Sequence, residues 1–333
     1  MTIRTVARRD GIVAPLRTPR EHPAGPWLVA LGAGLWGTES AWRIPLNHVF
    51  SPDVLVFWEH VILVACALPF ILPRLGELRR VSARALAWLV FSGIAGSALG
   101  AVLFTLALKH GNATVANVVL NLQPVLSTAA ACLVFGDRLA RGFYPWAAAA
   151  VVAGMVLVGL LTSAPLDAGA GFALLCALCW GLSTVAGRGA MVEMSLPLAS
   201  GLRVVVGLVS MLVLVTVSGE LHGAQLWTAA ASAKPGTTVL QLVLLATLSG
   251  GLPLVIYFKG LELTRASTAG YFERMQTLVA AAITWAWFGA ALAWYQVIAG
   301  IALIGVVAMV QRAQARTALP YVAPAQLPAA RAS

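Results

Sequence analysis

Stretches of about 20 mostly apolar residues recur along the whole chain, and they constrain its fold more than any other feature. Such a stretch is long enough to cross the hydrocarbon core of a bilayer as a helix. Because lipid offers no partners to backbone N–H and C=O groups, only helices and closed barrels span it. The chain is predicted to form ten spanning helices: Trp27–Ile44, Val54–Leu72, Leu86–Leu108, Thr114–Phe135, Tyr144–Leu161, Gly171–Ala190, Leu196–Val217, Val239–Leu261, Thr268–Phe288 and Trp294–Met309.

The composition excludes a soluble domain and a disordered chain. Hydrophobic residues make up 60% of the sequence and charged residues only 10%, whereas a soluble domain is about 25% charged. Disordered chains are poor in apolar residues. We therefore expect an all-α integral membrane protein with the lipid bilayer as a partner. The net charge of +10 does not indicate nucleic-acid binding, because the basic residues lie in the tails and in the short gaps between apolar runs.

The distribution of Lys and Arg predicts the orientation. With the N-terminus inside, most of the 22 basic residues fall in inside segments, and only Arg43, Lys109 and Lys234 fall outside. This bias predicts a multi-pass protein of the plasma or inner membrane with both termini in the cytoplasm. Residues 1–26 lack the apolar run of a signal peptide and are expected to form a cytoplasmic tail. Residues 313–333, rich in Ala and Pro, are expected to be disordered.

An internal repeat divides the chain into residues 27–162 and 168–312. Trp36-Gly37 recurs as Trp180-Gly181, and segment 113–136 aligns without gaps on segment 266–289. Each half holds five predicted helices, so the second half must cross the membrane in the opposite sense. Inverted repeats of this kind are typical of secondary transporters, whose substrate site lies near the midplane between the repeats.

Two patterns of small residues predict local features of the helices. Gly96-x-x-x-Gly100 in the third helix indicates a close helix contact. Its counterpart in the eighth helix contains Ser249-Gly250-Gly251-Leu252-Pro253, which predicts a bend because Pro removes a backbone hydrogen bond. The longest gap, Ser218–Thr238, is the only one with room for structure of its own.

Several short motifs extend the argument from the repeat. The first helix carries Leu35-Trp36-Gly37, the fourth carries Pro124 and ends in Gly136-Asp137-Arg138-Leu139, and the seventh carries Arg203. In combination they resemble the EamA branch of the drug/metabolite transporter superfamily. Three positions depart from that pattern: Glu59 stands in place of an Arg, Thr277 in place of a Pro and Ala290 in place of an acidic residue. The resemblance implies a ten-helix transporter that moves a small metabolite, an amino acid-like compound or a drug, commonly outward.

Ionisable residues inside the apolar runs are the first candidates for binding a substrate or a proton. A charge that faces lipid at mid-membrane costs at least ~2.5 kcal/mol, so such residues usually face a cavity or a partner. Glu39 and Glu59 are expected to approach one another in the outer half, where paired carboxylates can load and release a proton. The alternative for each is a paired or neutral structural residue. Arg203 has two open roles: binding a carboxylate or phosphate, or pairing with one of the protein's own glutamates.

Polar residues of the fourth and ninth helices are the remaining candidates. Glu273 is expected to face the cavity, and Asn117 and Asn121 share one helical stripe. Their amides either hydrogen-bond a substrate or join helices. The predicted residues for substrate or proton binding are Glu39, Glu59, Asn117, Asn121, Arg203, Tyr271, Glu273 and Gln276.

Together these features predict a secondary active transporter that works by alternating access, exports a small molecule and couples to protons. An integral-membrane enzyme is one alternative, but the chain has no H-E-x-x-H, G-x-S-x-G or P-loop signature. A channel without ion coupling is the other alternative. No catalytic residue, metal or cofactor is expected, because Cys176 and Cys179 lie among apolar residues and are expected to pack as small hydrophobic groups.

Overall fold

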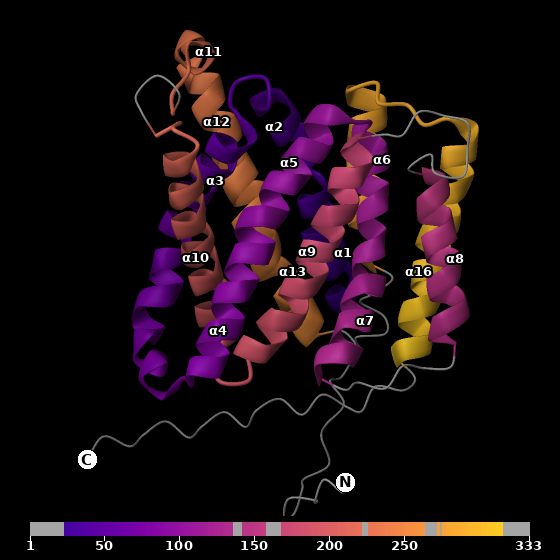
Figure 1. Cartoon of the computed structure of the whole chain (residues 1–333), viewed down its shortest axis with the longest axis horizontal. Coiled ribbons are helices and arrows are strands. Elements are labelled where there is room, and N and C mark those ends of the chain that lie inside the picture. Colours follow the sequence, from indigo (N-terminus) through magenta and orange to yellow (C-terminus); the bar gives the residue numbers. More distant parts are fainter. Residues whose placement is uncertain are drawn as a thin grey trace, which may run out of the picture.

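The computed structural model of the chain describes residues 23–135, 142–157, 168–221, 226–263, 272–273 and 275–315. Within these ranges the chain is helical and forms no strand, and its helices stand side by side (Figure 1). The first half contains α1 (Ala24–Gly37), α2 (Glu39–Leu46), α3 (Pro52–Ile71), η1 (Leu72–Arg80), α4 (Ala83–Ser92), η2 (Gly93–Leu99), α5 (Gly100–His110), α6 (Ala113–Val119), η3 (Leu120–Leu122), α7 (Gln123–Phe135) and α8 (Phe143–Leu157). The second half contains α9 (Ala168–Ala190), α10 (Leu196–Val217), α11 (Ala229–Ala233), α12 (Pro235–Ala246), η5 (Thr247–Gly251), α13 (Leu252–Glu262), α15 (Met275–Ala282), η6 (Ile283–Trp287) and α16 (Trp294–Ala315).

Most of the predicted spanning segments correspond to described helices. Six helical stretches are long and apolar enough to cross a membrane: Pro52–Arg80, Ala83–His110, Ala113–Val134, Ala168–Ala190, Leu196–Val217 and Pro235–Tyr257. Two shorter apolar helices, Phe143–Val156 and Trp294–Met309, occupy the fifth and tenth predicted segments. The expected all-helical architecture is therefore confirmed, while the count of ten crossings remains a prediction. Residues 268–271 and 274 of the ninth segment and the Gly136–Leu139 motif lie outside the described residues.

The first segment is two helices, whereas the sequence predicts one continuous helix over Trp27–Ile44. The break falls at Thr38, whose hydroxyl contacts the carbonyl oxygen of Leu35 (2.7 Å) and the hydroxyl of Ser249 in η5 (2.9 Å). Gly37 precedes it, and a Cβ at that position would lie only 2.5 Å from the carbonyl oxygen of Gln276. The small residue thus lets α15 approach the break closely.

Wide π-helical turns interrupt the third and eighth segments at equivalent places. η2 separates α4 from α5, and η5 separates α12 from α13. The bend predicted around Ser249–Pro253 therefore takes the form of a π turn that includes Ser249 and Gly251. Turns of this kind are rare and are frequent at functional sites. The long gap before α12 also holds the short helix α11.

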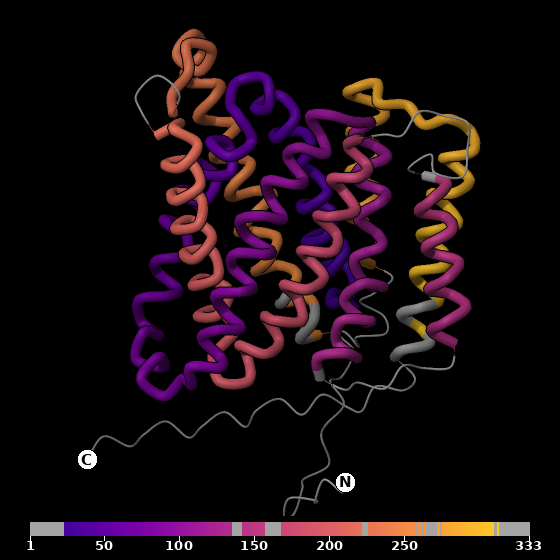
Figure 2. The backbone as a smooth tube through the Cα atoms, viewed as in Figure 1, coloured from indigo at the N-terminus to yellow at the C-terminus, as the bar shows by residue number. Residues whose placement is uncertain are grey.

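Helices of the two halves pack in one repeated pattern. α3 packs along α10 and α8 along α16, so these helices pair with their own counterparts. α1 packs against α13 and α15, and α9 packs in the same way against α5 and α7. The indigo trace of α1 and the orange trace of α13 accordingly run together in Figure 2, although they come from different halves. This arrangement is that of two intertwined copies of one helical unit.

Carboxylates tie α3 and α10 together at the end of the bundle that carries η1, which we call the η1 face. Glu77 accepts hydrogen bonds from the backbone N–H and the hydroxyl of Ser195 (both 2.8 Å). Glu193 accepts from the same two groups of Ser82 (2.7 and 2.8 Å). Ser195 and Ser82 precede α10 and α4, whose first N–H groups lack partners within the helix and favour a nearby negative charge. These four residues form the η1-face clasp.

A second clasp joins the same two helices at the opposite end, which we call the α2 face. The hydroxyl of Ser51 donates to Glu220 (2.6 Å), and the hydroxyl of Ser218 donates to Asp53 (3.1 Å). Ser51 precedes α3 as Ser195 precedes α10, at the same spacing along the chain that separates Trp36 from Trp180. α3 begins where α10 ends, so the two counterparts run in opposite directions, as inverted repeats require.

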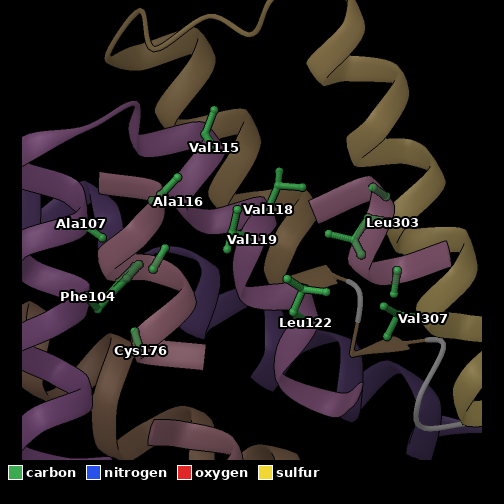
Figure 3. Packing of buried hydrophobic residues seen from close by; sticks show 14 of the residues in the cluster. Phe104, Ala107, Val115, Ala116, Val118, Val119, Leu122, Cys176, Leu303 and Val307 are labelled. Atoms are coloured by element: carbon green, nitrogen blue, oxygen red, sulfur yellow. The ribbon is translucent and has the colours of Figure 1, made fainter. Parts of the chain in front are cut away.

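The largest apolar core connects α5, α6, α7 and α9 with α8 and α16 (Figure 3). Val118 and Leu122 of the fourth segment pack with Leu303 and Val307 of α16. Cys176 of α9 is fully buried in the same cluster as a free thiol, which confirms the expected packing role. The α8–α16 pair is thereby held against the rest of the bundle through small and branched side chains.

Two glycines near the start of α9 give a matched test of this close packing. A Cβ on Gly169 would lie 2.5 Å from Cα of Gly111, whereas a Cβ on Gly171 would meet nothing within 4 Å. We expect Gly169→Ala to lower the free energy of unfolding by about 1–3 kcal/mol, because backbone cannot yield as a flexible side chain does. Gly171→Ala should leave that free energy unchanged or raise it slightly. Reversible unfolding in detergent micelles measures both, and equal effects would contradict the packing described.

The η1-face clasp should respond to pH through Glu193. The backbone N–H and the hydroxyl of Ser82 hold the pKa of this carboxyl below its ordinary value of 4.5. A pKa lowered in the folded state stabilises that state above about pH 4.5, and the contribution is lost as the pH falls through the lowered value. We expect Glu193→Ala to unfold at a lower temperature than the wild type near neutral pH. That difference should shrink on acidification, and a difference independent of pH would show that the clasp is not stabilised by an ionised Glu193.

Candidate functional site

Three charged side chains meet inside the bundle and form what we call the Arg43 cluster. Nη2 of Arg43 in α2 donates to both carboxylate oxygens of Glu59 in α3 (2.9 and 2.8 Å). Nε of Arg43 donates to Glu39, one turn earlier in α2 (2.9 Å), and Nη1 donates to the hydroxyl of Thr105 in α5 (2.8 Å). Arg43 is 1% exposed, so these bonds replace the water that a surface guanidinium would bind.

Local structure explains why these groups meet. The break at Thr38 makes Glu39 the first residue of α2, and Arg43 follows it at the i+4 spacing that brings two helical side chains together. The guanidinium also lies 5.8 Å from the centroid of the Phe104 ring, within cation–π range. Thr105 is itself fixed by a bond to the carbonyl oxygen of Ala101 (2.7 Å). Three helices therefore hold one arginine in place.

The cluster contains two carboxylates and one guanidinium. With both carboxylates ionised it carries an excess negative charge in an apolar surrounding, where an uncompensated charge is costly. Binding one proton or one small cation removes that excess. The two carboxylates differ in access, because the side chain of Glu39 is 16% exposed and that of Glu59 is 8% exposed, with both oxygens on Arg43. Glu39 is therefore the better placed of the two to exchange a proton.

Arg43 is the site residue that the sequence analysis missed. The count of basic residues placed it on the outside and gave it no role in the site, whereas its side chain is buried between α2, α3 and α5. The expected proximity of Glu39 and Glu59 is correct, and Arg43 is the reason for it. The Glu39–Arg43 spacing inside a predicted membrane helix was the signal available, since an i, i+4 pair satisfies its own desolvation.

The two predicted asparagines lie in helix contacts. Asn117 donates to the hydroxyl of Ser40 in α2 (3.0 Å), and Asn121 accepts from the hydroxyl of Thr277 in α15 (3.0 Å). Both amides are 6% exposed. The fourth segment is thus joined to the first and to the ninth by the helix-joining alternative, and substrate binding by these amides remains a prediction.

Glu273 lies beside an aromatic pair rather than beside the Arg43 cluster's own residues. It accepts a short hydrogen bond from the hydroxyl of Tyr257 in α13, whose ring packs 5.0 Å from that of Trp36. Gln276 lies in the first turn of α15, with its carbonyl oxygen against Gly37. Tyr271 lies outside the described residues. A carboxylate, a phenol and an indole therefore converge between α1 and α13.

Arg203 of α10 is not bonded to the residues of the Arg43 cluster. No ion pair joins it to a carboxylate within the ranges that the structure describes, and its Nε has no hydrogen-bond partner there. Its Nη2 faces Gly96 in η2 and lies beside Ser183 of α9. Pairing with a glutamate of the protein, one of the two expected alternatives, is thus not observed among the described side chains.

Metal-binding clusters and apolar grooves are two other kinds of candidate site. No group of three His, Cys, Asp or Glu side chains within the described ranges is arranged to hold a metal ion. A groove of about 490 Å³ between α8 and α16 is lined by apolar and aromatic residues. It includes none of the predicted binding residues, and it lies on a helix pair at one side of the bundle (Figure 1).

Comparison with known proteins shows which family and which solved structure this chain resembles. The EamA-like transporter family matches the chain twice, over residues 23–160 and 167–311. No curated protein matches. A solved structure titled "Crystal structure of protein" matches with a TM-score of 0.52 and 19% sequence identity, over 86% of this chain and 96% of that chain. At this identity the likeness shows a shared fold.

The Arg43 cluster predicts a large loss of stability when its cation is removed. Arg43→Gln leaves two buried carboxylates without a counter-charge, and we expect the free energy of unfolding to fall by about 3–5 kcal/mol. Adding Glu59→Gln to that variant should restore part of the loss, because one unpaired charge is removed with it. Arg74→Gln is the control, since Arg74 donates to a backbone carbonyl at the η1 face. An equal loss in the free energy of unfolding for the Arg43 and Arg74 variants would contradict the role given to the cluster.

Proposed function

We propose that this chain, which belongs to the EamA-like transporter family, carries a small molecule across a membrane by alternating access and couples that movement to protons at Glu39. The family is one of transporters of the drug/metabolite type, and the described helices agree with a multi-pass membrane protein. The observation that carries the proton part is the sharing of one buried arginine by two carboxylates. An export direction is part of the proposal.

The orientation follows from the charges at the two faces. Arginines gather at the η1 face, where the structure has Arg74, Arg79, Arg80, Arg84 and Arg188. The α2 face has Lys109 and Lys234, and its third basic residue, Arg43, is buried. Because cytoplasmic loops carry the excess of basic residues, we place the η1 face and both termini in the cytoplasm, in a plasma or inner membrane.

The proton step uses the excess charge of the Arg43 cluster. When Glu39 is ionised, the cluster carries more negative than positive charge, and a proton on Glu39 leaves a neutral set. Protonation would also weaken the hydrogen bond from Arg43 Nε, because a neutral acceptor binds a guanidinium less strongly than an ionised one. That bond lies within α2, so its weakening leaves Arg43 held by Glu59 of α3 and Thr105 of α5. We propose that this change gives protons a differential effect on two conformations, as coupling requires.

The conformational step would occur between helices that carry breaks. α3 and α10 are tied at both faces and would move as one unit. The break at Thr38 and the π turns η2 and η5 lie in the first, third and eighth segments, which bound the interface of the two halves. Glu273, Tyr257 and Trp36 lie at the same interface and are our candidates for contacting the transported molecule.

Glu39→Gln tests the coupling. Proteoliposomes with an imposed pH gradient are first screened with labelled amino acids, organic acids and amines for a compound that the wild type accumulates. We expect Glu39→Gln to lose gradient-driven accumulation of that compound and to keep exchange without a gradient, because glutamine cannot bind the proton. Glu39→Asp should keep the response to the gradient.

Two results separate the parts of the proposal. Full gradient-driven accumulation by Glu39→Gln would end the role of Glu39 while leaving transport intact. A wild type that moves no compound in either assay, although it is folded and correctly inserted, would contradict transport itself.

A further inference from the structure

Unpartnered polar atoms in the interior point to a second site. Within the described ranges, the buried side-chain atoms without a hydrogen-bond partner are Nε1 of Trp42, Oδ1 of Asn47, Nε2 of His60 and Nε of Arg203. Interiors seldom leave such atoms unpaired, and each exception needs an explanation. Two of the four, on His60 and Arg203, belong to one interface, formed by α3, η2 and α10.

Arg203 is the more costly of the two, because its charge lies in the bundle without an ion-pair partner among the described residues. An added Cβ on Gly96 would lie 3.4 Å from Nη2 of Arg203 and would also meet the hydroxyl of Ser183. The hydroxyl of Ser183 is already used, since it bonds with Ser92 on η2's flank through both backbone and side chain. Among the described residues no group accepts a hydrogen bond from Nε of Arg203, and this donor is left for a group from outside the protein.

His60 of α3 packs against α10 near Arg203. Its Nδ1 lies 2.8 Å from the carbonyl oxygen of Val56, which can only accept, so Nδ1 carries the hydrogen and the unpartnered Nε2 can only accept a hydrogen bond. Nε2 lies against Gly207, and a Cβ there would meet it at 2.8 Å. Gly207 follows Arg203 by one helical turn, so His60 and Arg203 lie along the face of α10 that packs against α3 and η2.

No carboxylate within the described ranges forms an ion pair with Arg203. Glu59 uses both oxygens on Arg43, and Glu39 uses one on the same residue. Arginine offers donors and no acceptor, in a planar fork that matches carboxylate and phosphate oxygens. The chemistry that completes the site is thus an anionic oxygen group.

We propose that Arg203 anchors the anionic group, a carboxylate or a phosphate, of the molecule that the protein transports. This assignment rests on the proposed function and names the substrate class for it: organic anions rather than amines.

The test measures anion binding without transport. Purified wild type in nanodiscs of phosphatidylcholine is heated with increasing acetate, succinate, inorganic phosphate or, as the comparison, ethylammonium. We expect at least one of the anions to raise the unfolding temperature in a saturable manner and ethylammonium to leave it unchanged. Arg203→Gln should abolish the anion effect and Arg203→Lys should retain part of it. Arg74→Gln, which removes a guanidinium at the η1 face, should retain all of it.

The unfolding temperature without ligand distinguishes an anion-binding Arg203 from one that only joins helices. Without ligand, Arg203→Met should unfold at the same temperature as the wild type or at a higher one, because it removes a half-buried charge that has no ion-pair partner among the described residues. A clear fall in that temperature would mean that Arg203 has a partner within the protein, and it would overturn the proposal. So would anion stabilisation that is equal in wild type and Arg203→Gln.

A third arm separates a transported anion from a lipid. If nanodiscs containing phosphatidylglycerol stabilise the wild type through Arg203 while no soluble anion does, the site holds a lipid headgroup and the proposal is overturned. Because no gradient is applied, loss of proton coupling at Glu39 would leave this result unaffected. Anion binding at Arg203 in a protein that moves nothing would count against transport alone.

Discussion

A charge inside an apolar bundle needs an opposite charge and enough hydrogen-bond partners, and the geometry around Arg43 follows from that requirement. One guanidinium reaches Glu39, Glu59 and Thr105, which belong to α2, α3 and α5. Arg43 is 1% exposed, so its bonds cannot be exchanged for solvent as they can on a surface. The positions of three helices are therefore linked through one side chain, and Glu39, the more exposed carboxylate of the set, is the residue to which the proposed function assigns the proton.

The repeat shapes both ends of the molecule as well as its middle. Ser195 and Ser51 precede counterpart helices, and each binds a carboxylate from the other half. The repeat also accounts for the π turns at equivalent places in the third and eighth segments. Features that look unrelated along the chain thus become two versions of one local structure.

The sequence was sufficient for the coarse architecture, because length and apolarity of a segment alone decide whether it can cross a bilayer. It also placed Glu39 near Glu59. It did not give Arg43 its place, because counting basic residues assigns any arginine near a helix end to the adjoining loop. The π turns were not predictable either, since one extra residue in a turn leaves no pattern in hydrophobicity. Arg203 shows the remaining limit: burial could be expected from the sequence, but the absence of a described carboxylate partner required coordinates.

The single residue that divides α1 from α2 has a mechanical consequence. On one side of Thr38, α1 packs against α13 and α15, and on the other side α2 is fastened through Arg43 to α3 and α5. The two parts of the first segment are therefore attached to different sets of helices and meet at one residue. Since the hydroxyl of Thr38 contacts Ser249 in the π turn of the opposite half, a change in the angle between α1 and α2 would act directly on the eighth segment at the place where its helix is interrupted.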